Sequence, residues 1–546
     1  MSSTLYRNGV VHSPADPFAE AILVENGTVA WLGADDTAAG MAARADEVVD
    51  LDGALVAPAF VDAHVHVLET GLALEGVDLS PAAGVRSLAD ALAAVRRAVE
   101  TRPASQADAP LLGFGWDEHS WPEGRRPTPE ELDAAAGGTP AYLARVDVHS
   151  ALVTSSFAGR TGLAALPGWH ADGWVTGEAH HAARDAARAV TPARRTALYR
   201  RALQHAAARG VVAVHEMSAP FIDTRAGLTE LLTTTADPGS GLPLVVGYRG
   251  EACVTADDAR ELLAAIPGLT GIGGDLDVDG SLGSHTAALR DPYEDAPDTA
   301  GTLSLTAEQV ANHVAAVTRA GVHGAFHVIG DRAMDEVLLG FQAAAAVEGT
   351  AAVAAAGHRV EHAEMVDALA LAALVLLGVR ISAQPAFDAA WGGPDGLYAA
   401  RLGVRRAIAL NPFADLAAAG IPLAFGSDAP VTPLDPWAGV RAAVHHTAPD
   451  QRISGRAAFR AATRGGWRLA GQDGTGAGEL RVGAPAHLAV WRAEHLTVEP
   501  GQGRLSTWSP EARAGTPLLP DLAPDAPTPV CLRTVRGGVT IHDALD

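Results

Sequence analysis

Eight short apolar runs, separated for the most part by Ala-rich segments, constrain the fold of this 546-residue chain most strongly. The runs have the character of strands, and intervening segments such as 306–320 and 333–347 have that of helices. Strands that alternate with helices form a parallel sheet, and eight such units close into a (β/α)8 barrel of the α/β class. The expected strands are residues 55–62, 210–216, 242–249, 271–279, 321–328, 358–362, 378–384 and 421–427.

Both ends of the chain are rich in short β-like segments. Asn8-Gly9 and Asn26-Gly27 are dipeptides that favour tight hairpins, and similar strand patterns return near the C-terminus. We therefore predict one small β-sandwich composed from both termini, residues 1–55 and 475–546.

The remaining residues, 56–474, are predicted to hold the barrel. The stretch from about 80 to 205 is too long for a single connection between neighbouring barrel strands. We interpret it as an insertion with helices at 88–100 and 179–208 and a strand near 140–146.

Potential metal ligands end four of the barrel strands. His64 and His66 close the first run with one residue between them, so both side chains point to the same side of a strand. His327, His362 and Asp428 end the fifth, sixth and eighth runs. Functional groups gather at the carboxyl ends of barrel strands, so these side chains are expected to converge on a divalent cation. Nitrogen and oxygen donors of this kind suit zinc, with iron and manganese as alternatives.

Charge and cysteine content narrow the range of partners. The net charge of -24 argues against nucleic acid and anionic membranes, which bind basic surfaces. The two cysteines resemble no disulfide framework, no apolar signal core opens the chain, and no stretch is apolar enough to span a bilayer. We expect a cytoplasmic protein with a small-molecule substrate and no nucleic-acid or membrane partner, and we leave assembly into a homo-oligomer open.

Several motifs resemble one enzyme family. The run that ends in Asp62-Ala-His-Val-His66 is similar to the opening of the barrel in the amidohydrolase superfamily. Six further segments resemble its YtcJ-like branch (amidohydrolase family 3), which includes N-substituted formamide deformylase: Gly115–Asp117, Arg145–Ala151, Asp279–Ala287, His327–Ala333, Val360–Ala363 and Gly426–Val431. The resemblance implies a metal-dependent hydrolase of non-peptide carbon–nitrogen bonds, on a distorted TIM barrel with a small composite β-sandwich.

The resemblance also implies roles for the five ligand candidates. His64 and His66 would hold the more buried cation. His327 and His362 would hold a second cation, or orient the water and the substrate. Asp428 would bind metal and accept the proton of the attacking water, and its structural alternative is a helix N-cap.

One departure from the family concerns lysine. Relatives often place a carboxylated lysine on the fourth strand to bridge two cations, and this chain contains no lysine. Asp275 occupies the equivalent position, counted back from Asp279. Asp275, Asp277 and Asp279 alternate, so all three could face the barrel interior, either as ligands or as hydrogen-bonded polar residues. Because the Asp275 side chain is far shorter than carboxylated lysine, we predict one tightly bound ion rather than two.

Six further residues are candidates for substrate binding. Three match motifs of the branch within the insertion: Trp116, Asp117 and His149. Three come from the residue pattern alone: His215 after the second strand, Asp331 after the fifth and Phe387 in an aromatic loop-like segment. Each has a structural alternative in packing or hydrogen bonding. Glu361 should point away from His362 on a strand, which favours a structural role.

Amide-type hydrolysis by metal-activated water is the leading functional hypothesis. Hydrolytic deamination of a ring amine and hydrolysis of a lactone are alternatives that use the same barrel and the same nucleophile. A non-catalytic scaffold is disfavoured, because all five candidate ligands are present.

Overall fold

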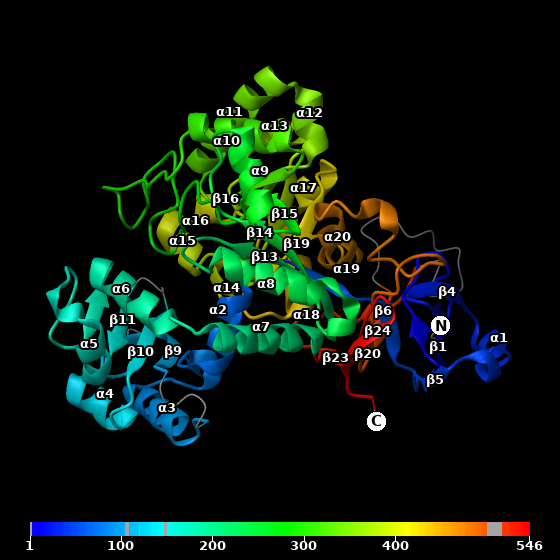
Figure 1. Cartoon of the computed structure of the whole chain (residues 1–546), viewed down its shortest axis with the longest axis horizontal. Helices are drawn as coiled ribbons and strands as arrows, with labels where there is room; N and C mark the ends of the chain where they lie inside the picture. The colour runs from blue at the N-terminus through cyan, green and yellow to red at the C-terminus, as the bar shows by residue number, and fades with distance from the viewer. Residues whose placement is uncertain (1–2, 104–108, 119–120, 147–149, 499–515, 546) are drawn as a thin grey trace. The chain divides into compact units, whose positions relative to one another are not determined.

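The computed structural model forms two compact units. One, here called the barrel unit, comprises Met1–Val67 and Leu203–Asp546, and the other, the inserted unit, comprises Leu68–Ala202 (Figure 1). The structure describes residues 3–103, 109–118, 121–146, 150–498 and 516–545.

A parallel sheet of eight strands dominates the barrel unit, which confirms the predicted barrel. Its strands are β7 (Phe60–Val65), β13 (Val211–Ser218), β14 (Leu244–Arg249), β15 (Leu269–Ile272), β16 (His323–Val328), β17 (Arg359–His362), β18 (Arg380–Ala383) and β19 (Leu423–Phe425). Backbone hydrogen bonds from Asp428 N to His64 O (2.8 Å) and from His66 N to Ala429 O (3.0 Å) join the first and last strand ends.

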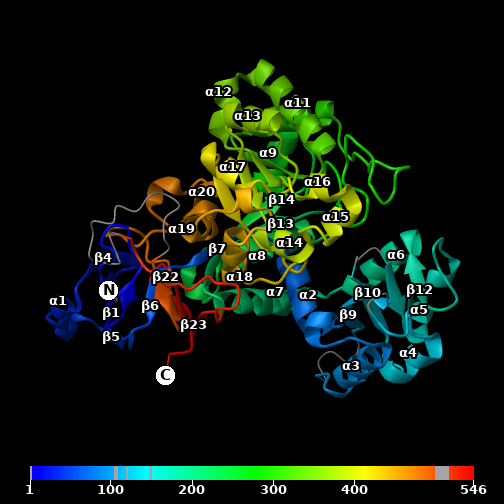
Figure 2. The same cartoon turned by 180° about the vertical axis from the view of Figure 1, so that it is seen from behind.

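Helices cover the outside of these strands, as Figure 2 shows from behind. The principal ones are α8 (Arg225–Ala236), α9 (Ala256–Ala265), α10 (Ala307–Ala320), α11 (Asp331–Glu348), α13 (Ala368–Leu376), α17 (Phe413–Ala418) and α18 (Pro436–Val444). Local sequence fixes their ends. At α10, Thr306 and Gln309 form a capping box, and Gly321 ends the helix at a φ of 74°.

Two further sheets form the predicted β-sandwich from both ends of the chain. The first contains β1 (Ser3–Arg7), β3 (Ala21–Glu25), β4 (Thr28–Gly33) and β5 (Glu47–Asp50). The second contains β2 (Val10–Val11), β6 (Leu55–Pro58), β20 (Leu488–Arg492), β23 (Val530–Arg536) and β24 (Val539–Asp543). Buried side chains of both sheets, among them Ile22, Val56 and Leu488, share one core.

Two details of this region differ from the sequence prediction. Residues 55–58 pair with β20 in the sandwich, and only Phe60–Val65 belongs to the barrel. A continuous buried run has no periodicity that marks where one sheet ends and the next begins. Asn26-Gly27 does turn the β3–β4 hairpin, whereas Asn8-Gly9 carries the chain from one sheet to the other, with Asn8 at a φ of 61°.

The inserted unit has its own five-stranded sheet and its own helices. The strands are β8 (Val77–Asp78), β9 (Leu111–Trp116), β10 (Ala141–Arg145), β11 (Ser150–Val153) and β12 (Trp174–Thr176). The helices include α3 (Leu88–Glu100), α4 (Pro129–Ala136), α5 (Ser155–Thr161) and α6 (Gly177–Arg188), and α7 (Pro192–Ala207) leads back to the barrel unit.

Within the described ranges, no single helix is both long and apolar enough to cross a bilayer. The pair α11 and α12 (Thr350–Ala356) meets the length and composition criteria only when taken together, and it is bent by 118°.

Candidate metal centre

Imidazoles and carboxylates meet at the carboxyl ends of the barrel strands. His64 and His66 come from β7, His327 from β16 and His362 from β17, and Asp428 follows β19. The ring centres of His64 and His362 are 4.9 Å apart, and those of His327 and His362 are 4.4 Å apart. The structure therefore brings all five predicted ligands into one cluster.

Asp275 joins this cluster as a sixth member. Its two carboxylate oxygens lie 3.5 Å from His64 Nε2 and 3.4 Å from His66 Nε2. The Asp428 carboxylate lies 3.6 Å and 3.1 Å from the same two nitrogens. Three sets have ligand atoms within 4.8 Å of one another: His64, His66 and Asp275; His64, His362 and Asp428; Asp275, His327 and His362.

The expectation that Asp275 is too short to reach the others is wrong. Strand β15 ends at Ile272, and Gly273 and Gly274 follow with φ values of 125° and 90°. These conformations are open to glycine and strained for other residues. They turn the chain out of the strand, so a side chain with a single methylene group contacts both imidazoles.

The same turn ends the expected alternation of three aspartates. The Asp279 carboxylate accepts hydrogen bonds from the backbone N–H groups of Ala288, Ile329 and Gly330, at 2.9, 3.0 and 2.7 Å. These hydrogen bonds tie Asp279 to the segments around Ala288 and Ile329. Asp277 forms an isolated parallel bridge with His327 instead of extending β15.

Hydrogen bonds to Nδ1 fix three of the four rings. His64 Nδ1 lies 3.0 Å from the Glu361 carboxylate, His66 Nδ1 3.1 Å from the Met217 carbonyl, and His362 Nδ1 2.8 Å from Gln384 Oε1. Each ring thus turns Nε2 towards the cluster. For His327 the pattern is reversed, because its Nε2 lies 3.3 Å from the Gly280 carbonyl.

These donors fit a divalent cation. The Nε2 atoms of His64 and His362 and one oxygen of Asp275 are buried and have no hydrogen-bond partner within the described ranges. Buried polar atoms normally have partners, so three such atoms in one cluster require an explanation. Imidazole nitrogens with carboxylate oxygens are the donors that zinc and similar cations bind.

The electrostatic field of the cluster also favours a positive charge. Burial alone would lower the pKa of His66. The carboxylates of Asp275 and Asp428 outweigh this effect and raise the pKa to about 10. Burial likewise opposes a charged His327, yet the nearby aspartates raise its pKa to about 9. A cation at this position would take the place of those protons.

Glu361 contacts the cluster although it precedes His362 by one residue. His362 has a φ of 68°, outside the range of a regular strand, so the two neighbours do not diverge as strand residues do. Burial raises the pKa of Glu361, but Arg359 and the hydrogen bond from His64 lower it to about 2. Sequence analysis missed this contact because the period of two assumes regular strand dihedral angles.

The candidates for substrate binding in the barrel unit have different surroundings. Phe387, on α14 (Pro385–Trp391), stacks on the His362 ring with centres 6.0 Å apart. His215 is fully buried, with Nδ1 2.9 Å from an Arg359 nitrogen. The Asp331 carboxylate accepts a hydrogen bond of 2.8 Å from the Arg290 backbone at the start of α11. Only Phe387 among these three touches a ligand ring.

The other candidates belong to the inserted unit. Trp116 is buried, and its indole N–H donates to the Leu143 carbonyl at 3.0 Å. Asp117 pairs with Arg145 at 2.8 Å. His149 lies outside the described residues. The role of all three in substrate binding stays a prediction.

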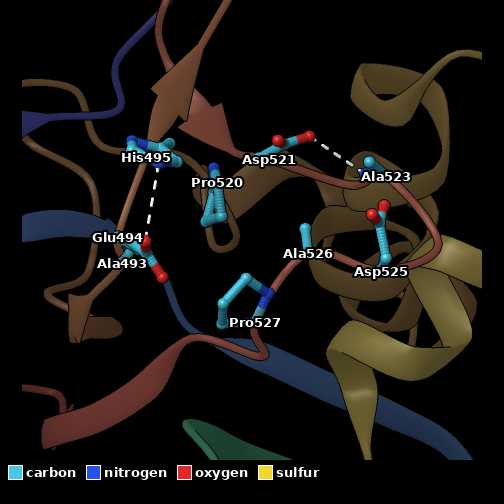
Figure 3. A pocket seen from close by; sticks show the side chains of 9 residues that line it. All are labelled: Ala493, Glu494, His495, Pro520, Asp521, Ala523, Asp525, Ala526 and Pro527. Atoms are coloured by element: carbon cyan, nitrogen blue, oxygen red, sulfur yellow. Dashed lines mark hydrogen bonds and ion pairs between the residues drawn. The ribbon is translucent and has the colours of Figure 1, made fainter.

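A surface cavity of about 280 Å³ lies elsewhere in the barrel unit (Figure 3). Its lining residues are Ala493, Glu494, His495, Pro520, Asp521, Ala523, Asp525, Ala526 and Pro527. Glu494 and His495 form an exposed pair at 3.6 Å. The lining includes none of the six clustered residues, so we assign the chemistry to the barrel cluster.

Comparison with known proteins agrees with this geometry. The amidohydrolase family matches residues 47–542, so the chain belongs to that family. The putative amidohydrolase YtcJ of Bacillus subtilis is 26% identical over 445 residues, 78% of this chain and 80% of that protein. N-substituted formamide deformylase of Arthrobacter pascens is 31% identical over 147 residues, 27% of this chain and 26% of that enzyme.

A solved structure extends the comparison to the fold. The crystal structure of an uncharacterized metal-dependent hydrolase from Pyrococcus furiosus is 29% identical, with a TM-score of 0.71. The match covers 89% of this chain and 98% of that one. The chain is therefore a metal-dependent hydrolase on an amidohydrolase barrel.

Proposed function

We propose that the protein hydrolyses a non-peptide, amide-type carbon–nitrogen bond of a small molecule, with zinc as its cation. The observation that carries this proposal is the clustering of four imidazoles and two carboxylates, in three overlapping sets of possible ligands, at the carboxyl ends of the barrel strands. The likeness to N-substituted formamide deformylase supports the type of bond, although it covers 27% of the chain.

The clustered residues would have different roles in this reaction. His64, His66 and Asp428 would hold the more buried cation, and His327 and His362 would face a second position. A divalent cation supplies Lewis acidity and lowers the pKa of a bound water to about 7. Asp428, buried and within reach of both histidines of β7, would accept a proton from the attacking water and pass it to the leaving nitrogen. Phe387 offers an apolar surface beside His362.

The position of Asp275 affects how many cations the cluster could bind. Asp275 belongs to the set with His64 and His66 and to the set with His327 and His362. We infer one tightly held ion, because two carboxylates serve the His64 and His66 side. Asp275 also belongs to the set with His327 and His362, so a second ion would bind there more weakly. Metal analysis should give close to one equivalent after dialysis and two at excess zinc, and two equivalents retained through dialysis would contradict the difference in strength.

Substrate class is tested with a mixed panel. N-formyl amines, hydantoins, aminopurines and lactones are incubated with zinc-loaded protein, and ammonia and acid release are measured. Turnover of formyl amines or hydantoins supports amide hydrolysis. Ammonia from aminopurines would favour a deaminase, and acid from lactones alone would favour a lactonase. Chelated protein and Asp428→Asn are the controls, because both should lose turnover.

A further inference from the structure

An ion pair lies inside the barrel beneath the ligand cluster. Arg359 and Glu361 are both fully buried, and Arg359 Nε lies 2.5 Å from Glu361 Oε1. The two residues are separated by one position on β17, so their side chains share a face. A buried pair of this kind is often no more stable than apolar residues of similar volume. Its presence in a barrel core therefore requires a reason other than stability.

The Glu361 carboxylate links this pair to a proposed ligand. Its Oε2 accepts from Arg359 Nη2 at 2.9 Å and lies 3.0 Å from His64 Nδ1. With Nδ1–H donated to the carboxylate, the His64 lone pair is on Nε2, the atom that faces Asp275 and Asp428. Neutral oxygens of Met217 and Gln384 serve the corresponding nitrogens of His66 and His362.

Other strands hold the Arg359 guanidinium in place. Nη2 donates to the Ala63 carbonyl of β7 at 2.8 Å, and Nη1 lies 2.9 Å from His215 Nδ1 on β13. The guanidinium carbon lies 4.7 Å from the ring centre of Tyr248 on β14. A planar group fixed from three further strands gives the Glu361 carboxylate one orientation.

We propose that Arg359 and Glu361 are positioning residues that orient His64 and fix its tautomer for cation binding. This inference rests on the proposed metal centre. A carboxylate behind a ligand imidazole raises the basicity of the ligand and holds its ring, so the ring loses less conformational freedom when a cation binds. A pair that served stability alone would leave cation affinity unchanged.

The test uses Co²⁺ as the probe, on the full chain stripped with a chelator. Affinity comes from competition with a chelating dye, and coordination from the visible absorption spectrum of bound Co²⁺. We expect Glu361→Gln to bind Co²⁺ roughly tenfold to a hundredfold more weakly and with an altered spectrum. Glu216→Gln is the matched control, because Glu216 is also buried but accepts a backbone hydrogen bond, from Val67 at 2.6 Å. Because Glu216 also interacts electrostatically with His66, Asp388→Asn is the second control: Asp388 is a buried carboxylate that accepts from the Thr447 backbone at 2.8 Å, and this variant should bind Co²⁺ as the wild type does.

A second pair of variants distinguishes a role of Arg359 and Glu361 in positioning His64 from a role in folding stability. Arg359→Met leaves an unpaired buried carboxylate, so its urea midpoint should fall, and Arg359→Met with Glu361→Gln should recover the midpoint. The double variant should nevertheless keep the weak Co²⁺ affinity. Wild-type affinity in Glu361→Gln, or its return in the double variant, would overturn this inference alone. Failure of the wild-type chain to bind Co²⁺ would overturn the metal centre and this inference together.

Discussion

Asp428 has the surroundings of a proton acceptor. Its side chain is buried, and its carboxylate lies 3.1 Å from His66 Nε2. Burial raises the pKa of this carboxyl group, but His64 and His66 lower it well below its usual range. The group is therefore ionised at neutral pH, which is the state that a proton acceptor requires.

The Asp428→Asn variant tests this role. The amide keeps the shape of the side chain but cannot act as a base, so kcat should fall at least about a hundredfold. Asp388→Asn is a matched control, because Asp388 is a buried carboxylate that accepts from the Thr447 backbone at 2.8 Å. Steady-state rates on the substrate found in the panel provide the measurement. Equal turnover in Asp428→Asn and wild type would exclude Asp428 as the base.

The residue pattern predicted the side chains of the ligand cluster, but it did not predict the residues that hydrogen-bond to them. His64, His66, His327, His362 and Asp428 end strands, and a parallel barrel brings strand ends together. The partners of these rings follow no local rule. Glu361 is 297 positions from His64, and Gln384 reaches His362 through its side chain from the end of the next strand. Contacts of this kind depend on the closed barrel and leave no periodic signal.

At the scale of elements, the turn after β15 depends on a close approach of two backbone segments at Gly273. A Cβ atom at Gly273 would lie 1.8 Å from the Ala325 carbonyl oxygen, at a φ of +125°. Gly273→Ala should therefore cost roughly 2–5 kcal/mol of unfolding free energy from strain and overpacking. It should also displace Asp275 and reduce the zinc bound at excess metal.

Gly420→Ala provides the control for this prediction. Gly420 also has a positive φ, +75°, but a Cβ atom there would meet nothing within 4 Å. Only the backbone strain of about 1–2 kcal/mol applies, and zinc binding should be unaffected. Urea unfolding and metal analysis of both variants make the comparison. If Gly273→Ala and Gly420→Ala lost similar amounts of unfolding free energy and of bound zinc, the close approach at Gly273 would be unimportant.

Elements with a clear period were predicted well, and irregular ones were not. The sequence placed a helix at 306–320, and α10 spans Ala307–Ala320, because its caps and apolar face are local features. The fourth strand was expected at 271–279 but ends at Ile272. Alternating aspartates imitate a strand, whereas the two preceding glycines adopt conformations that no strand contains.

At the scale of the whole molecule, neutral buried histidines make stability depend on pH. Burial lowers the pKa of His313 and His323 to about 4 and that of His358 to about 3, although a hydrogen bond to Ile272 partly opposes this at His313. These values lie below the unfolded value of about 6.5, so the unfolded chain binds more protons. The contribution of these neutral histidines to the free energy of unfolding is complete above about pH 6.5 and is lost as the pH falls towards about 4.

His313→Gln isolates one of these contributions. His313 Nδ1 accepts from Cys253 N at 3.0 Å, and Nε2 lies 3.1 Å from the Ile272 carbonyl, two contacts that an amide can make at any pH. Between pH 7.5 and 5.5 the unfolding free energy of the variant should fall about 1.4 kcal/mol less than that of the wild type. Urea unfolding at both pH values measures the difference. An equal fall in both proteins would contradict a neutral His313.

The carboxylate of Asp275 has a consequence for how the centre assembles. A carbamate bridge exists only after a lysine amine has reacted with dissolved carbon dioxide, so its occupancy follows the supply of that gas. Asp275 carries its carboxylate from the moment of synthesis, and the turn at Gly273 and Gly274 delivers it to the histidines as the chain folds. The apoprotein can therefore take up cations in buffer free of bicarbonate, at a rate that carbon dioxide does not alter.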